Sequence, residues 1–211
     1  MFLESIKESE DVYSFLFEKE KGLTWKAGQH GLFNITHKKI KKPIRPFSIA
    51  CAPTENVVRL TMRISDQPSE FKKAMLELKQ GMQVKMSGPV GGFYLKDNSP
   101  SLLIAGGIGI TPFLAMMAQL DEEAASFELH LSVRTDGGFL DEIRAEYGSR
   151  ASLYRDDRDE AIQLDQLLAK QPLGTHLYVC GPAGMLDWVL TAAAGLGWPA
   201  QNLHSERFLA P

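Results

Sequence analysis

The sequence predicts a small antiparallel β-barrel followed by a doubly wound α/β unit with a parallel sheet. Before residues 96–100, apolar residues alternate in short runs bounded by Gly, Pro, Asn or charge, as in antiparallel strands. After these residues, apolar strands alternate with helical segments, which is typical of βαβ units around a parallel sheet. We therefore expect two domains, at residues 1–98 and 99–211.

Short strands and a single helix make up the first expected domain. Four runs alternate as strands do: 12–17, 31–35, 47–49 and 57–62. Only the segment 69–79 has helical spacing, with Phe71, Met75 and Leu78 on one face and Gly81 after its end. Short strands with one helix are typical of a small closed barrel.

Strands and helices alternate in the second expected domain. The expected strands are 102–105, 127–133, 152–154, 176–180 and 202–205, and the expected helices are 111–120, 138–147, 163–169 and 185–196. The uncharged stretch between Asp97 and Asp121 is long enough to suggest a membrane span. However, the glycines and the proline in its middle favour a buried strand, a turn and a helix.

Composition excludes several classes of protein. The 211 residues are 44% hydrophobic and 23% charged, which supports a packed core and argues against disorder. The formal net charge of -3 disfavours a nucleic-acid partner. The two cysteines, Cys51 and Cys180, exclude a disulfide framework and a four-cysteine zinc or iron–sulfur site, and we expect no metal. With no export signal visible, we expect a cytoplasmic protein without a membrane span.

The first candidate binding site is the glycine-rich turn between a strand and a helix, 105–112. Gly107 and Gly109 would allow a sharp turn and the close approach of a pyrophosphate. Thr111 and Pro112 open the helix, whose free N–H groups attract phosphate. Pro112 stands where the third glycine of the usual motif would be, and a tight turn without a ligand is the alternative.

A second turn, 178–185, also ends a strand and opens a helix. Ligands of open α/β sheets bind at the carboxyl ends of strands near the switch point, so the two turns could hold one dinucleotide. The candidate residues are Cys180, Gly181, Pro182 and Met185. For Cys180, the alternative is a small buried side chain with a packing role.

Two further motifs lie in the expected barrel. In Arg45-Pro46-Phe47-Ser48, the arginine can bind a phosphate, the phenylalanine can pack on a ring, and the serine can hydrogen-bond a ring nitrogen. A strand entry with a surface arginine is the alternative. The second motif, Gly88-Pro89-Val90-Gly91-Gly92-Phe93, is first of all a turn between the domains, although its glycines would also leave room for a flat ring.

With a terminal His204-Ser205-Glu206-Arg207-Phe208, these motifs resemble, in the same order, those of the ferredoxin–NADP reductase superfamily. The resemblance spans nearly the whole chain, and the second half is most similar to the reductase components that feed oxygenases. It implies a flavin-binding barrel and an NAD(P)-binding α/β domain. The implied activity is hydride transfer from NADH or NADPH to flavin, and then electron transfer to a ferredoxin or to an iron–sulfur or haem oxygenase component.

The resemblance also implies roles for single residues. Ser48 would lie at flavin N5, Cys180 would border the nicotinamide, and Glu206 could assist protonation near N5 or help bind the partner. A solvent-exposed tail charge is the alternative for Glu206. The residues expected to bind flavin or nucleotide are Arg45, Pro46, Phe47, Ser48, Met62, Ser69, Glu70, Phe71, Gly88, Gly91, Gly92, Phe93, Gly107, Gly109, Thr111, Pro112, Ser132, Arg134, Cys180, Gly181, Pro182, Met185 and Phe208.

The choice of cofactor stays open in part. Phe47 stands where the family usually has Tyr, which removes one hydrogen bond and keeps the stacking on the ring. Ser69 resembles the family's phosphate-binding Ser or Thr, but the glycine that usually stands just ahead of it is absent, so FAD is expected and FMN is possible. A plain helix cap is the alternative for Ser69. Ser132 and Arg134 lean toward a 2′-phosphate, but arginine can also stack on adenine, and NADH and NADPH both stay open.

Alternatives also stay open for the function. One is a reductase that uses flavin as a loosely held substrate, and another is a flavin-binding electron-transfer subunit that never meets NAD(P)H. The chain ends at Pro211 without the ferredoxin domain that such reductases often carry. Either the ferredoxin is a separate protein, or another acceptor is used, or the domain was removed. The basic run 38–42 could steer an acidic ferredoxin, but the sequence slightly favours a solvated loop.

Overall fold

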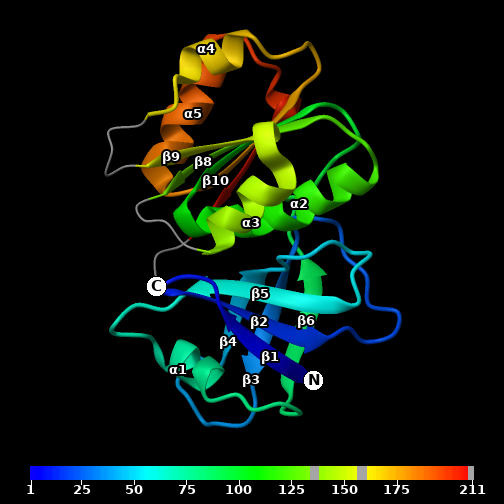
Figure 1. Cartoon of the computed structure of the whole chain (residues 1–211), viewed down its shortest axis with the longest axis vertical. Helices are drawn as coiled ribbons and strands as arrows, with labels where there is room; N and C mark the ends of the chain where they lie inside the picture. Colours follow the sequence, from blue (N-terminus) through cyan, green and yellow to red (C-terminus); the bar gives the residue numbers. More distant parts are fainter. Residues whose placement is uncertain (134–137, 156–160, 209–211) are drawn as a thin grey trace.

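A computed structural model describes residues 1–133, 138–155 and 161–208, which fold into a barrel and a parallel-sheet unit (Figure 1). Over these residues, the barrel consists of two three-stranded antiparallel sheets with the strand orders β1-β2-β5 and β4-β3-β6. The elements of the barrel are β1 (Phe2–Lys7), β2 (Val12–Glu18), β3 (His30–Ile35), β4 (Ile44–Ser48), β5 (Val57–Arg63), α1 (Glu70–Leu76) and β6 (Val84–Val90).

Two seams of hydrogen bonds close the barrel. At one seam the N–H of Ala50 donates to the carbonyl of Arg59 at 2.8 Å, and at the other the N–H of Phe2 donates to the carbonyl of Met82 at 2.8 Å. One apolar core fills the space between the sheets, and it includes side chains of α1 such as Met75. The seams and the shared core give the small barrel that the sequence predicts.

The helix of the barrel begins where the sequence predicts and ends earlier. Ser69 caps α1, because its Oγ accepts a hydrogen bond from the N–H of Lys72 at 3.4 Å. The helix ends at Leu76, and Glu77 forms the C-cap. Leu78 is nevertheless buried, so the apolar face continues past the last helical turn.

Five parallel strands form the sheet of the second unit, in the order β11-β10-β7-β8-β9. The strands are β7 (Ser101–Gly106), β8 (Phe127–Val133), β9 (Ala151–Arg155), β10 (His176–Gly181) and β11 (Leu203–Arg207). The helices are η1 (Gly107–Ile110), α2 (Thr111–Glu122), α3 (Gly138–Tyr147), η2 (Gly148–Arg150), α4 (Leu164–Ala169), α5 (Ala183–Gly195) and η4 (Ala200–Asn202). This is the doubly wound fold that the sequence predicts.

The order of the strands places a switch point between β7 and β10. The chain runs outward from β7 to β8 and β9, and then returns to the other side of β7 for β10 and β11. The two glycine-rich turns follow β7 and β10, so they meet at this switch point. In the described part of the chain, no helix is both long and apolar enough to cross a membrane.

The barrel and the parallel sheet share a core across α2. Phe93, which follows β6, packs edge to face on Phe113 of α2 and on Tyr178 of β10, with ring centroids 5.8 and 5.9 Å apart. In Figure 1, α2 and α3 lie on the side of the sheet that faces the barrel, and α4 and α5 lie on the other. The two units are therefore packed against each other through apolar side chains.

The segment Gly88–Phe93 differs from the expected turn between the domains. Its first residues continue β6 as far as Val90, which pairs with His30 of β3. The connection to the second unit therefore starts only at Gly91. The sequence conceals this strand because Gly88 and Pro89 are residues that usually interrupt strands.

Candidate functional site

A row of four residues crosses the junction between the two units. Ser48 ends β4 and is the direct cross-strand partner of His30, which begins β3. The Nδ1 atom of His30 lies 3.5 Å from Oε1 of Glu206 on β11. Glu206 in turn pairs with Cys180 of the neighbouring strand. Ser48 and Glu206, both predicted as catalytic, thus adjoin His30, and the third predicted residue, Cys180, lies beside Glu206.

His30 was not predicted from the sequence. The nearest signal in the sequence is its position between Gly28 and Gly31. In the structure, the imidazole fits against Gly91, where a Cβ atom would lie 2.8 Å from Cε1 and Nδ1 of His30. Gly91 also has a φ of +103°, so a side chain there is excluded both by the ring and by the backbone.

Two polar atoms in this row are buried without a hydrogen-bond partner among the described residues: Oγ of Ser48 and Oε2 of Glu206. Buried polar atoms in folded proteins are almost always hydrogen-bonded. Two such atoms on opposite sides of one junction therefore indicate a place for a polar ligand. Glu206 is not a solvent-exposed tail charge, because its side chain is only 18% exposed.

Burial also sets the protonation of the row. Burial raises the pKa of Glu206 to about 7 and lowers the pKa of His30 below its usual range. Burial thus favours the neutral form of each side chain over its charged form. The 3.5 Å contact is consequently a site where a proton can be bound and released.

Cys180 forms a neutral wall of the junction. Its side chain is fully buried, and the pKa of its thiol is raised by burial and, to a smaller extent, by the nearby Glu206. A thiol in this state is a poor nucleophile and a poor base. Cys180 is therefore a packed, protonated thiol beside Glu206.

The two glycine-rich turns are locked together through their backbones. A Cβ atom on Gly109 would lie 2.3 Å from the carbonyl oxygen of Cys180 and 3.0 Å from Cα of Gly181. A Cβ atom on Gly106 would lie 2.8 Å from Cδ of Pro182 and 2.9 Å from Sδ of Met185. Only glycine allows the turns to touch in this way. Both turns therefore present their backbones at one place on the sheet edge.

Next to these turns lies a cleft between the barrel and the parallel sheet. Its residues from the sheet unit are Gly107, Ile108, Ile110, Leu131, Val133 and Leu140, and those from the barrel are Ser9, Asp11, Val12 and Arg63. Nε of Arg63 lies 3.0 Å from a carboxylate oxygen of Asp11. The cleft thus has an apolar floor and a charged rim. The sequence analysis did not identify the barrel side of this cleft.

The predicted barrel motif lies on β4. Phe47 is half-buried and packs against Phe33 and Phe71, with ring centroids 6.4 and 5.4 Å apart. Arg45 is half-buried on the same strand as Ser48. Ser69 caps α1, which matches the alternative of a plain helix cap. Burial and the nearby Arg63 lower the pKa of Lys72, the residue whose N–H this cap accepts.

Several predicted binding residues have other contacts in the structure. Met62 and Phe93 were predicted to contact a cofactor, but their side chains are 2% and 5% exposed and pack in the two cores. The hydroxyl of Thr111 is buried and donates to the carbonyl of Ile108. Glu70 is exposed and accepts a hydrogen bond from the N–H of Lys41. These side chains therefore stabilise local structure.

The remaining predicted residues are placed as follows. Pro112 is buried in the first turn of α2, Pro182 caps α5, and Phe208 is half-buried against the core that includes Cys180. Ser132 is half-buried near the carboxyl end of β8 and has interactions of its own. Arg134 lies outside the described residues.

The basic run 38–42 lies far from the junction. It belongs to the loop between β3 and β4, at the end of the barrel opposite the parallel sheet (Figure 1). Nζ of Lys38 is paired with a carboxylate oxygen of Glu77 at 2.6 Å. Within residues 1–133, 138–155 and 161–208, no group of three or more His, Cys, Asp or Glu side chains is placed to hold a metal ion.

A barrel followed by a five-stranded parallel sheet, with glycine turns at the switch point and a polar row at the junction, defines a ferredoxin–NADP reductase-like protein. Phthalate dioxygenase reductase shares this fold with a TM-score of 0.86 and 26% identity over 99% of this chain and 67% of that one. A ferredoxin NADP+ reductase from Neisseria gonorrhoeae, at 17% identity, shares the fold with a TM-score of 0.79 over 98% of this chain and 96% of that one.

A match to a protein-family model shows the family of the chain. The model of the dimethylamine monooxygenase subunit DmmA-like N-terminal domain matches residues 73–203, and the chain belongs to this family. Similar proteins include the vanillate O-demethylase oxidoreductase of Pseudomonas putida, with 34% identity over 96% of this chain and 66% of that protein. The carnitine monooxygenase reductase subunit of Acinetobacter pittii is 37% identical over 61% of this chain and 43% of that protein. The matches therefore span 43% to 66% of the length of these relatives.

Proposed function

We propose that this chain is a reductase module that binds flavin, oxidises NADH or NADPH, and delivers electrons to a separate oxygenase component. In this proposal, residues 1–98 form the flavin-binding domain and residues 99–211 form the NAD(P)-binding domain. Membership of the DmmA-like family and similarity to two proteins named as an oxidoreductase and a reductase subunit support it. We place the reaction in the cytoplasm, in line with two free cysteines.

The observation that carries the proposal is the polar row at the junction. The unpartnered Oγ of Ser48 and Oε2 of Glu206 lie on opposite sides of the place where the two glycine turns meet the barrel. A flavin could satisfy both atoms, because it carries hydrogen-bonding nitrogens on a ring together with a phosphate. When bound, a flavin accepts two electrons together and releases them one at a time. We propose FAD, with FMN as the alternative.

The residues of the chain would then bind and orient the flavin and the nucleotide, and they would exclude water from the junction. Arg45 would bind the flavin phosphate, Phe47 would pack on the ring, and Ser48 would hydrogen-bond its reactive edge. The backbone around Gly107 at the start of η1 and α2 would receive the pyrophosphate of the pyridine nucleotide. Cys180 would border the nicotinamide as a neutral, water-excluding wall.

Anaerobic titration with NADH and with NADPH separately tests this proposal. We expect a purified yellow protein whose flavin absorbance is bleached by at least one of the two nucleotides. Mass spectrometry of the released flavin then identifies FAD or FMN. A coloured protein that neither nucleotide bleaches would contradict NAD(P)H oxidation. A colourless protein that reduces added flavin would instead support the reading in which flavin is a substrate.

The electron acceptor can be tested without knowing its identity. Ferricyanide accepts one electron at a time, so each NAD(P)H oxidised should reduce two ferricyanide ions. A purified oxygenase component from a relative's system, such as a vanillate O-demethylase oxygenase, then tests the class of partner. Failure to reduce ferricyanide would contradict one-electron delivery. Reduction of ferricyanide without transfer to any iron–sulfur or haem component would contradict the oxygenase partner.

A further inference from the structure

His30 joins the two sides of the candidate site. It contacts Glu206 of β11, with 3.5 Å between Nδ1 and Oε1, and it lies directly opposite Ser48 on the neighbouring strand of the barrel. Its ring rests against Gly91, where no side chain fits. These contacts hold the imidazole between the barrel and the last strand of the parallel sheet.

We propose that His30 is a positioning residue for Glu206, and that the two side chains together hold the exchangeable proton of the junction. This inference rests on the proposed function. Oxidation of NAD(P)H by two one-electron acceptors gives NAD(P)+, two reduced acceptors and one proton. The pair binds that proton on the carboxylate of Glu206 and releases it to water from His30, whose side chain is 25% exposed.

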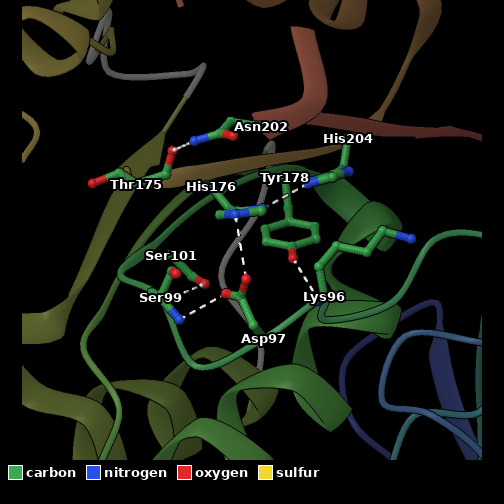
Figure 2. A network of polar contacts seen from close by, with 9 residues as sticks. All are labelled: Lys96, Asp97, Ser99, Ser101, Thr175, His176, Tyr178, Asn202 and His204. Atoms are coloured by element: carbon green, nitrogen blue, oxygen red, sulfur yellow. Dashed lines mark hydrogen bonds and ion pairs between the residues drawn. The ribbon is translucent and has the colours of Figure 1, made fainter. Parts of the chain in front are cut away.

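The strand that carries Glu206 is anchored next to this pair. His204, two residues earlier on β11, donates to or accepts from His176 of β10, with 2.8 Å between Nε2 and Nδ1 (Figure 2). The rings of His204 and Tyr178 are also stacked, with centroids 4.6 Å apart. On its other side, His176 faces a carboxylate oxygen of Asp97 at 3.8 Å. This network fixes the backbone of β11. The side chain of Glu206 can still rotate, and its contact with His30 restrains that rotation.

The titratable neighbours of the His30–Glu206 pair do not change their protonation state near pH 7. The titratable groups nearest to it on the adjoining strands are Cys180 on β10 and His204 on β11. Burial keeps the thiol of Cys180 protonated, because its pKa is raised. Burial and the neighbouring His176 lower the pKa of His204 to about 4, so it is neutral near pH 7. From the barrel, the adjoining residues Ser48 and Val90 do not titrate.

Reciprocal titration of the flavin-free protein tests the coupling. In protein with carbon-13-labelled glutamate, the carboxyl signal that disappears in Glu206→Gln is assigned to Glu206. We expect His30→Gln to raise the proton affinity of Glu206 roughly tenfold, because the carboxylate loses the imidazole nitrogen that lies 3.5 Å from it and stabilises its charged form. We expect Glu206→Gln to lower the proton affinity of His30 by the same factor, since coupling between two sites is reciprocal. His37→Gln, a half-buried histidine after β3, is the matched control.

The same variants in the flavin-loaded enzyme test the role of the pair in turnover. We expect His30→Gln to shift the pH profile of kcat by the amount found for Glu206, with KM for the nucleotide unchanged. Equal titration of Glu206 in the wild type and His30→Gln would overturn the pairing, and His30→Asn repeats the test if the first variant does not fold. Coupling without a shift in kcat would overturn the proton exit. A protein that never oxidises NAD(P)H would refute the proposed function and leave the coupling measurable.

Discussion

Gly109 is the position where one added carbon tests the whole arrangement of the two turns. Its Cβ atom would lie 2.3 Å from the carbonyl oxygen of Cys180, whereas ordinary contacts begin near 3.4 Å. Both groups are backbone, so the turn after β7 or the turn after β10 must move by about 1 Å. Overpacking of this kind destabilises a protein by about 1–3 kcal/mol, which for a chain of this size lowers Tm by roughly 3–10 °C.

Thermal unfolding of Gly109→Ala, followed by circular dichroism, measures this effect. The control is Gly195→Ala at the end of α5, where nothing lies within 4 Å of the new carbon. Because alanine favours helices, the control should be neutral or more stable by up to about 1 kcal/mol. Separation of the turns should also weaken nucleotide binding, measured by calorimetry. A Gly109→Ala variant with the wild-type Tm and affinity would refute the backbone contact on which the site is built.

Three further predictions concern single side chains. Because the pKa of Glu206 is raised from 4.5 to about 7, the folded protein binds this proton more tightly than the unfolded chain, and its contribution to stability is lost as pH rises toward 7. In urea unfolding, the free energy of unfolding of Glu206→Gln should therefore rise by about 2–3 kcal/mol relative to that of the wild type between about pH 4 and pH 8. A difference in free energy that does not change with pH would contradict the raised pKa. Ser48→Ala removes a hydroxyl that has no hydrogen-bond partner in the part of the chain that the structure describes, so stability should change by less than about 0.5 kcal/mol. Flavin reduction, followed by stopped flow, should slow more than about tenfold. Equal reduction rates would show that Ser48 does not face the ring. Tyr178→Phe removes the hydroxyl that accepts the N–H of Lys96, and we expect a loss of about 1–2 kcal/mol in urea unfolding, which an unchanged midpoint would disprove.

The parallel-sheet unit was predicted closely because its elements are nearly continuous apolar runs bounded by glycine, proline and charge. The predicted strand 127–133 coincides with β8, and the predicted helix 138–147 coincides with α3. Such runs carry their own local signal. β1 and β6 were missed because β1 is mostly exposed and β6 contains Gly88 and Pro89. Their pairing depends on β2 and β3, which lie elsewhere in the sequence.

Parts of the candidate site could also be predicted from the sequence, and other parts could not. The glycine turns could be recognised because a close approach of backbones requires residues without a side chain, and this requirement is visible in the sequence. His30 could not be recognised, because a histidine acquires its chemistry from its neighbours and from its burial. Those neighbours, Ser48, Gly91 and Glu206, come from three distant segments.

The sequence alone determined which segments become strands, helices and glycine turns, since these depend on local periodicity and on residues with unusual backbone freedom. It also determined the order of the two domains. Only the tertiary structure decided which side chains meet at the junction and how burial shifts their pKa values. The physical reason is that pKa values and unpaired polar atoms are set by burial, and burial exists only once distant strands are packed together.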